Sequence, residues 1–134
     1  MSKSNNKSIV RRYYEEVLNG RQLQVLDELA DPNFVSYLVD GRGVGLEIYK
    51  QAITGTLATM PDLRVTIEDQ IAEDDKVVTR WKAEGTPQIE FAGIKPNGES
   101  ITVTAIHVHR LQNRKLLEHW EAINLHAIQR VKPS

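Results

Sequence analysis

The residues best suited to chemistry lie near the end of the chain, between positions 101 and 125. This stretch reads ITVTAIHVHRL, QNRK and then LLEHWEAINL, and it holds three of the four histidines. Its titratable and aromatic side chains are His107, His109, Glu118, His119, Trp120 and Glu121. Charged or titratable groups are uncommon within apolar segments unless they are paired or functional. We therefore expect any chemistry of this protein to lie here.

The stretch predicts two strands joined by a short polar turn, and the length of that turn decides which residues meet. A three- or five-residue loop around 113–115 would pair Leu111 with Leu117. It would set His109 opposite His119 and His107 opposite Glu121, all on one face. A two- or four-residue loop would instead set His107 opposite Trp120 and turn Glu121 to the other face. The sequence leaves both registers open.

In the first register, Glu121 and His107 would form a catalytic pair. A carboxylate in an apolar pocket has its charged form disfavoured, which raises its pKa and makes it a better base at neutral pH. His107 would orient Glu121 or donate a hydrogen bond to a developing enolate. Two structural interpretations stay open: Glu121 pairs with Arg110 or Lys82, or His107 is a hydrogen-bonded core residue.

Three histidines and a glutamate also make up the donor set of a zinc site. Rings on flat strands would have to converge to share an ion, so we expect no metal here. The remaining pocket wall is expected to be aromatic or imidazole, and a flat ligand would stack on it. We assign substrate binding to His109, His119, Tyr37, Trp81, Tyr49, Phe91 and Trp120.

Two further features have structural explanations. Asp69 breaks the alternation of its strand, which favours a bulge or a strand end over a pocket position. The glycines of GRGVG (41–45) do not make a phosphate loop, because no lysine-serine pair follows them. We expect a flexible loop there that leads into a helix.

Length and composition indicate one domain over residues 1–134, with flexible tails at 1–7 and 128–134. A net charge of −1 gives no footprint for nucleic acid and no polybasic patch for membranes. The chain has no cysteine, which excludes disulfides and thiolate sites. The first residues lack an apolar segment of the secretory kind, so we expect a cytoplasmic protein.

Apolar spacing predicts helices first and strands afterwards, and therefore an α+β domain. The expected helices span 8–18, 23–29 and 46–59, and the expected strands span 34–39, 63–71, 76–85, 101–111 and 116–125. A curved antiparallel sheet would wrap around the three N-terminal helices and leave a pocket between the layers. The other parity of the last two strands is also partly apolar, which favours a homodimer through a sheet face.

Three segments of the second half carry a family resemblance: MPDLRVTIEDQIAEDDKVVTRWKAEGT (60–86), FAGIKPNGESITVTAIHVHRL (91–111) and LLEHWEAINL (116–125). With the helical first half, NKSIVRRYYEEVLNGRQLQVLDELADPNFV, they resemble the SnoaL-like polyketide (ester) cyclases. That family belongs to the superfamily of ketosteroid isomerase and nuclear transport factor two. The resemblance implies a cone-shaped α+β fold with a pocket between sheet and helices.

The resemblance also implies a reaction without metal or cofactor. A carboxylate removes a proton α to a carbonyl of a hydrophobic ester, and the enolate closes a ring by aldol addition. The positions that match are Glu121 and His107, although many relatives have aspartate where this chain has Glu121. The same fold also serves binding proteins without catalysis and other isomerases or hydrolases. A water-activating Asp/Arg/Asp set, as an epoxide hydrolase would need, is not evident among the pocket-facing positions.

Overall fold

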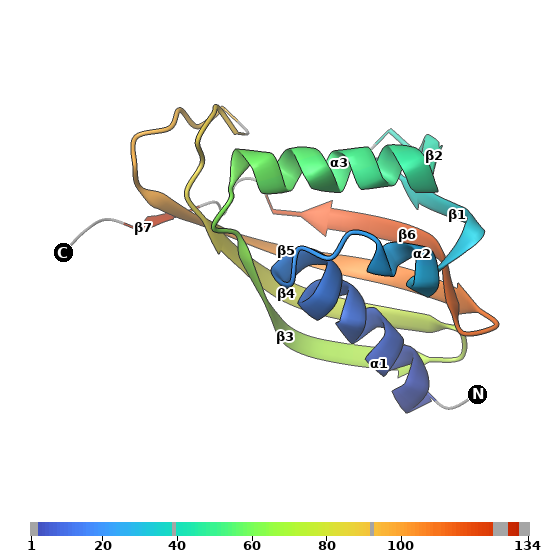
Figure 1. The fold of residues 1–134 in the computed structure, drawn as a ribbon. Helices are drawn as coiled ribbons and strands as arrows, with labels where there is room; N and C mark the ends of the chain where they lie inside the picture. Colours follow the sequence, from blue (N-terminus) through green and yellow to red (C-terminus); the bar gives the residue numbers. More distant parts are fainter. Residues whose placement is uncertain (1–2, 39, 92, 125–128, 132–134) are drawn as a thin grey trace.

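The computed structural model describes residues 3–38, 40–91, 93–124 and 129–131. Its helices are α1 (Lys3–Arg12), the π-helix η1 (Tyr13–Asn19), α2 (Val25–Leu29) and α3 (Leu46–Thr59). Figure 1 shows the helices on one side of a strongly curved sheet. α1 and η1 pack near the β3 edge of the sheet, and α3 packs near β1. The predicted α+β class and its three helical segments are confirmed.

The sheet has the strand order β2-β1-β6-β5-β4-β3, and β7 pairs with β5. Its strands are β1 (Ala30–Tyr37), β2 (Gly43–Gly45), β3 (Arg64–Glu73), β4 (Lys76–Gly85), β5 (Ser100–Gln112), β6 (Lys115–Ile123) and β7 (Gln129–Val131). β1 runs parallel to β6, so the sheet is mixed and not wholly antiparallel as the sequence suggested. β6 lies beside β1 only after the chain has passed through the four strands β2, β3, β4 and β5.

Several element boundaries differ from the prediction. α1 already begins at Lys3, before the expected cap at Ser8. Pro32 lies within β1, where the register with β6 is irregular, and a proline is tolerated there because no ladder donor is needed. The loop at 41–45 contributes β2. β7 lies within the expected C-terminal tail; residues 1–2, 128 and 132–134 of the two tails fall outside the described residues.

The turn between β5 and β6 has two residues, Asn113 and Arg114. Both have positive φ, 52° and 64°, as the tight hairpin turn of type I′ requires. Leu111 therefore pairs with Leu116, and the expected pairing with Leu117 is wrong. A two-residue turn was expected to set His107 opposite Trp120 and to turn Glu121 to the outer face.

A β-bulge at Leu117 reverses that outcome. The ladder is irregular between Arg110 and Leu111, and beyond it Arg110 lies opposite Glu118. One extra residue on β6 shifts the following side chains back by one position and so exchanges their faces. His109 consequently lies opposite His119 and His107 opposite Glu121, which are the pairs of the first of the two registers considered.

The π-helix turns two consecutive tyrosines into the core. Tyr13 is 3% exposed, and both Tyr14 and Val17 are fully buried. In a regular α-helix, with 3.6 residues per turn, Tyr14 would point about 100° away from Tyr13. π-helical turns are rare and occur frequently at functional sites.

The outer face of the sheet carries a transverse row of apolar residues. Strand pairing places them side by side as Ile71, Val78, Val108, Trp120 and Tyr37. Nearby Ile106 is 44% exposed. The homodimer through a sheet face stays a prediction, and this row is the surface that would be buried.

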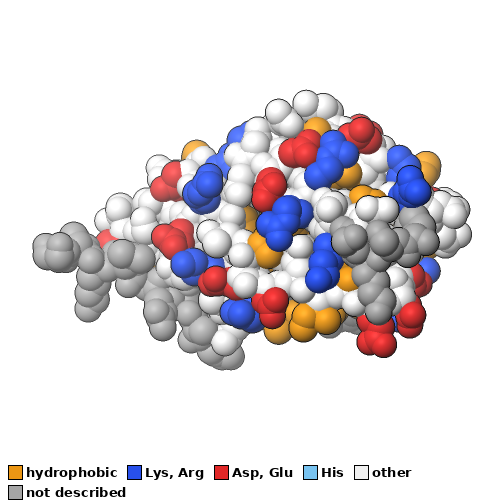
Figure 2. Space-filling model, turned by 90° about the horizontal axis from the view of Figure 1, so that it is seen from below, with side chains coloured by type: hydrophobic (Ala, Val, Ile, Leu, Met, Phe, Trp, Pro, Cys, Tyr) orange, Lys and Arg blue, Asp and Glu red, His pale blue; other side chains and the backbone are white. Residues whose placement is uncertain are grey.

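Charged side chains of both signs are mixed on another face of the molecule. On the face shown in Figure 2, basic and acidic side chains are interspersed and no patch of one sign forms. No described helix has the length and apolarity needed to cross a membrane.

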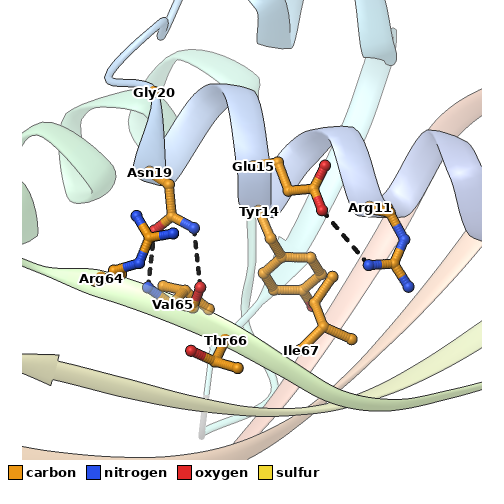
Figure 3. A pocket seen from close by; sticks show the side chains of 9 residues that line it. All are labelled: Arg11, Tyr14, Glu15, Asn19, Gly20, Arg64, Val65, Thr66 and Ile67. Atoms are coloured by element: carbon orange, nitrogen blue, oxygen red, sulfur yellow. Dashed lines mark hydrogen bonds and ion pairs between the residues drawn. The ribbon is translucent and has the colours of Figure 1, made fainter.

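Asn19, the last residue of η1, attaches the helices to the edge strand β3. Its side-chain amide donates to the carbonyl of Val65 at 2.8 Å and accepts from the N–H of Val65 at 2.7 Å. Figure 3 shows both bonds, together with the Arg11–Glu15 ion pair further along the same groove. The amide thus pairs with the edge backbone as a neighbouring strand would.

We predict that Asn19→Ala lowers the free energy of unfolding by about 2 kcal/mol, because it removes two hydrogen bonds from a half-buried backbone. Urea unfolding followed by circular dichroism measures the change. Arg11→Ala in the same groove is the matched control, since its ion pair is exposed and should contribute little. An Asn19→Ala variant as stable as the control would contradict this role.

Candidate functional site

A cavity of about 370 Å³ lies between the helices and the concave face of the sheet. Its wall is mainly apolar, as is typical of small-molecule sites. The polar and titratable groups that reach it include Tyr13, Ser36, Tyr49, His107, His119 and Glu121. Three further lining residues, Leu38, Ile48 and Ile123, are exposed and therefore mark the mouth.

A chain of hydrogen bonds links the sheet to the helix. His107 Nε2 contacts a carboxylate oxygen of Glu121. On the other side of the ring, Nδ1 lies 2.7 Å from the hydroxyl of Tyr14. When Tyr14 donates to Nδ1 and Nε2–H donates to Glu121, the imidazole is neutral and the negative charge stays on the carboxylate. The predicted contact between Glu121 and His107 is therefore present.

Glu121 does not form an ion pair with Arg110 or with Lys82, the two partners considered for a structural role. Arg110 pairs with Glu118, and Lys82 pairs with Glu84. The described partner of Glu121 is the imidazole of His107.

Glu121 lies at the mouth of the cavity and not in the dry interior that the sequence led us to expect. Its side chain is 34% exposed, whereas that of His107 is 3% exposed. β1 contributes to this difference, because its pairing with β6 ends at Tyr37 and Trp120, one residue before Glu121. The acid is accessible from solvent while its partner is buried.

Tyr13 and Tyr49 form a hydroxyl pair in the cavity wall. Their oxygens are 2.5 Å apart. Burial raises the pKa of both groups above the ordinary value of a tyrosine, so both are protonated at neutral pH. Only one proton can lie between the two oxygens, which leaves the other free for a ligand.

His107, His109 and His119 form a compact cluster. Ring centroids are 4.4 Å apart for His107 and His119, 4.8 Å for His109 and His119, and 5.6 Å for His107 and His109. One nitrogen from each ring lies within 4.8 Å of the other two. The rings therefore do converge, contrary to the expectation for flat strands.

His109 and His119 are buried and neutral. Burial, and then the neighbouring His107, lowers the pKa of each well below the ordinary histidine value. Nδ1 of His119 lies 3.0 Å from the hydroxyl of Ser36. Nε2 of His119 and Nδ1 of His109 are buried and have no hydrogen-bond partner in the part of the chain that the structure describes. Such unpaired buried groups cost roughly 1–3 kcal/mol each, so they need an explanation.

The other predicted substrate-binding residues divide into two groups. Tyr49, Trp81 and Phe91 line the cavity. Tyr37 reaches its rim, but its hydroxyl donates to Glu118, and its ring stacks on Trp120 at 5.2 Å.

Three predicted positions lie elsewhere. Trp120 belongs to the outer face, because it alternates with His119 and Glu121 along β6. His109 lies behind His107 and is not among the residues that line the cavity. Asp69 follows the predicted bulge in β3 and is exposed, so it does not contribute to the site.

Sequence reasoning missed Tyr14 and Ser36. Tyr14 lies within the π-helical turn, for which the pattern gives no signal. Ser36 lies on β1, whose parallel pairing with β6 places it beside His119. Only knowledge of the strand order would have identified it.

The groove in Figure 3 is a second hollow, of about 500 Å³, between η1 and β3. Its polar groups are largely engaged with one another, as the Arg11–Glu15 pair and the two Asn19–Val65 bonds show. The cavity with the histidines is the stronger candidate.

The family model of the SnoaL-like polyketide cyclases matches residues 8–130. The chain therefore belongs to the SnoaL-like polyketide cyclase family. No curated protein matches it at a significant level.

Solved structures of similar proteins support the same fold. AclR from Streptomyces galilaeus, whose description names a hydroxylase, is 26% identical with a TM-score of 0.81, and the match covers 92% of each chain. IdmH from Streptomyces antibioticus, whose description names a polyketide cyclase, is 27% identical with a TM-score of 0.78, covering 89% of this chain and 91% of IdmH. A SnoaL-like protein from Jannaschia is 23% identical with a TM-score of 0.83, covering 93% and 89%.

The neutral buried histidines predict a pH dependence of stability. In the unfolded chain His109 and His119 have a pKa near 6.5, and folding lowers both values. The unfolded state therefore binds more protons below this pH, and stability falls as the pH drops from 7.5 to 5. Urea unfolding in the presence of EDTA measures this slope. His119→Gln should flatten it, and an unchanged slope in that variant would contradict the assignment.

Proposed function

We propose that the protein catalyses an intramolecular aldol-type ring closure of a hydrophobic ester that carries carbonyl groups. Glu121 is the acid/base and His107 orients it. The observation that supports this proposal is the hydrogen-bonded chain of Glu121, His107 and Tyr14 at the mouth of an apolar cavity. Family membership supports the reaction class, and the description of IdmH names the same class for that protein.

In the proposed reaction, the Glu121 carboxylate takes a proton from the carbon α to a substrate carbonyl. The electron pair of the broken C–H bond forms an enolate, whose oxygen accepts a hydrogen bond from the Tyr13–Tyr49 pair. The α carbon then attacks a second carbonyl carbon of the same molecule. The new alkoxide takes the proton back from Glu121, which restores the carboxylate.

The surrounding residues suit this reaction. His107 is held on both sides, by Tyr14 and by Glu121, so the carboxylate has one preferred orientation. Trp81 packs edge-on against His107 at 4.9 Å, and with Phe91 it provides an apolar wall for the substrate rings. Partial exposure of Glu121 fits a base that must accept a large substrate at the cavity mouth.

We predict that Glu121→Gln lowers turnover by about 10²-fold or more, the scale expected for loss of a general base. The assay follows deuterium incorporation α to the carbonyl of hydrophobic aryl-ketone esters in D₂O by NMR. Glu118→Gln is the matched control, because this glutamate lies on the same strand but is bonded to Tyr37 and Arg110 on the outer face.

Wild-type exchange should exceed the buffer background and remain in Glu118→Gln. If Glu121→Gln exchanges deuterium at the wild-type rate, Glu121 is not the base. If the wild-type protein binds the esters without exchanging deuterium, the cavity serves binding without catalysis.

Tyr49→Phe should lower the rate of the same exchange by about 10²-fold, because it removes one donor to the enolate oxygen. The effect should fall on kcat more than on KM, since the enolate charge develops only in the transition state. Tyr37→Phe is the control, and its hydroxyl bonds Glu118 on the outer face. Equal rates for the two variants would exclude the tyrosine pair from the reaction.

A further inference from the structure

We propose that His107, His109 and His119 bind a zinc ion whose fourth position faces the cavity. The three rings come from two neighbouring strands, with His107 and His109 on β5 and His119 on β6. Three imidazoles and one open position are the ligand set of a catalytic zinc site.

The distances suit such an ion after a small adjustment. One nitrogen from each ring already lies within 4.8 Å of the others. Zinc–nitrogen bonds of about 2.0–2.1 Å at tetrahedral angles need nitrogens about 3.4 Å apart. The most distant nitrogens would approach one another by about 1.4 Å, which rotation of the rings about their side-chain torsions would have to supply.

Two of the three rings have a nitrogen that bonds to nothing else among the described residues. These atoms are Nδ1 of His109 and Nε2 of His119, and both are buried. His107 differs, because both of its nitrogens are engaged. Binding exchanges one of its present partners, Tyr14 or Glu121, for the ion.

The outer contacts match those of metal-bound histidines, which use their second nitrogen to bond a carboxylate, a carbonyl or a water. His119 has Ser36 at 3.0 Å from its Nδ1, which fixes the ring with Nε2 free. His107 has the carboxylate of Glu121, whose negative charge offsets part of the charge of the ion.

The environment separates the site from bulk water while leaving one approach. Tyr13 packs on His109 at 5.5 Å, and Tyr49 packs on His119 at 5.2 Å. His107 and His119 line the cavity, whereas His109 lies behind them. An ion between the three rings would therefore face the cavity on one side only. Its position next to Glu121 would polarise a substrate carbonyl, a role that rests on the proposed function.

Cobalt(II) is the probe, because it takes the zinc geometry and absorbs visible light. Protein without a histidine tag is dialysed against a chelator and then titrated with Co²⁺ at pH 7.5. We expect the intense absorbance of a four-coordinate site, saturation at one ion per chain, and its loss when Zn²⁺ is added. Zinc should also raise the melting temperature, because it binds only the folded state.

His109→Gln and His119→Gln should each remove the absorbance and the zinc-dependent rise in melting temperature. Ser36→Ala keeps all three rings and should weaken binding about 10–100-fold, as loss of an outer contact does elsewhere. Glu118→Gln is the control, because it changes the residue next to His119 on β6 without touching any of the three rings, and it should bind like wild type.

Absence of the four-coordinate absorbance in the wild-type protein would overturn the proposal. So would unchanged binding in His109→Gln or in Ser36→Ala, either of which would place the ion elsewhere. Circular dichroism shows whether each variant folds, and Ser36→Ala keeps the test valid if a histidine variant does not. Metal binding is measured without substrate, so its failure is distinct from failure of deuterium exchange.

Discussion

The pairing of β5 with β6 determines every other feature of the site. A strand turns alternate side chains to opposite faces, so a shift of one residue would move Glu121 and His119 out of the cavity. The two-residue turn at Asn113 and Arg114 would by itself cause that shift, and the bulge at Leu117 cancels it. One extra residue on β6 thus holds the imidazoles and the carboxylate on the same concave face.

The helices supply further polar groups to the cavity that the hairpin forms. Tyr14 reaches His107 and Tyr13 reaches Tyr49, so consecutive residues of one π-helical turn support two different parts of the cavity. Glu121 is partly exposed at the mouth, whereas the hydroxyls of Tyr13 and Tyr49 are buried in the wall. The mainly apolar cavity therefore carries a carboxylate and two hydroxyls among its few polar groups.

Much of this arrangement was predictable from the sequence, because alternation along single strands is a local property. It offered the shared face of His107 and Glu121 as one of two registers, and a bulge at Asp69 as one of two explanations. The features that strand alternation could not predict depend on neighbours distant in sequence. The exposure of Glu121 follows from where β1 ends, and the contact of Ser36 follows from a parallel pairing that no local pattern encodes. The inward position of Tyr14 needs a π-helical turn, which has no recognised sequence signal.

The attachment of Asn19 to Val65 also affects how molecules meet one another. β3 is the outermost strand on its side of the sheet, and an open strand of this kind can recruit a strand from another molecule. Asn19 occupies the N–H and carbonyl of Val65, and the bulge after Ile67 interrupts the regular spacing further along. One amide side chain, next to the charged Arg64, thereby leaves another molecule no free backbone group at Val65 with which to pair.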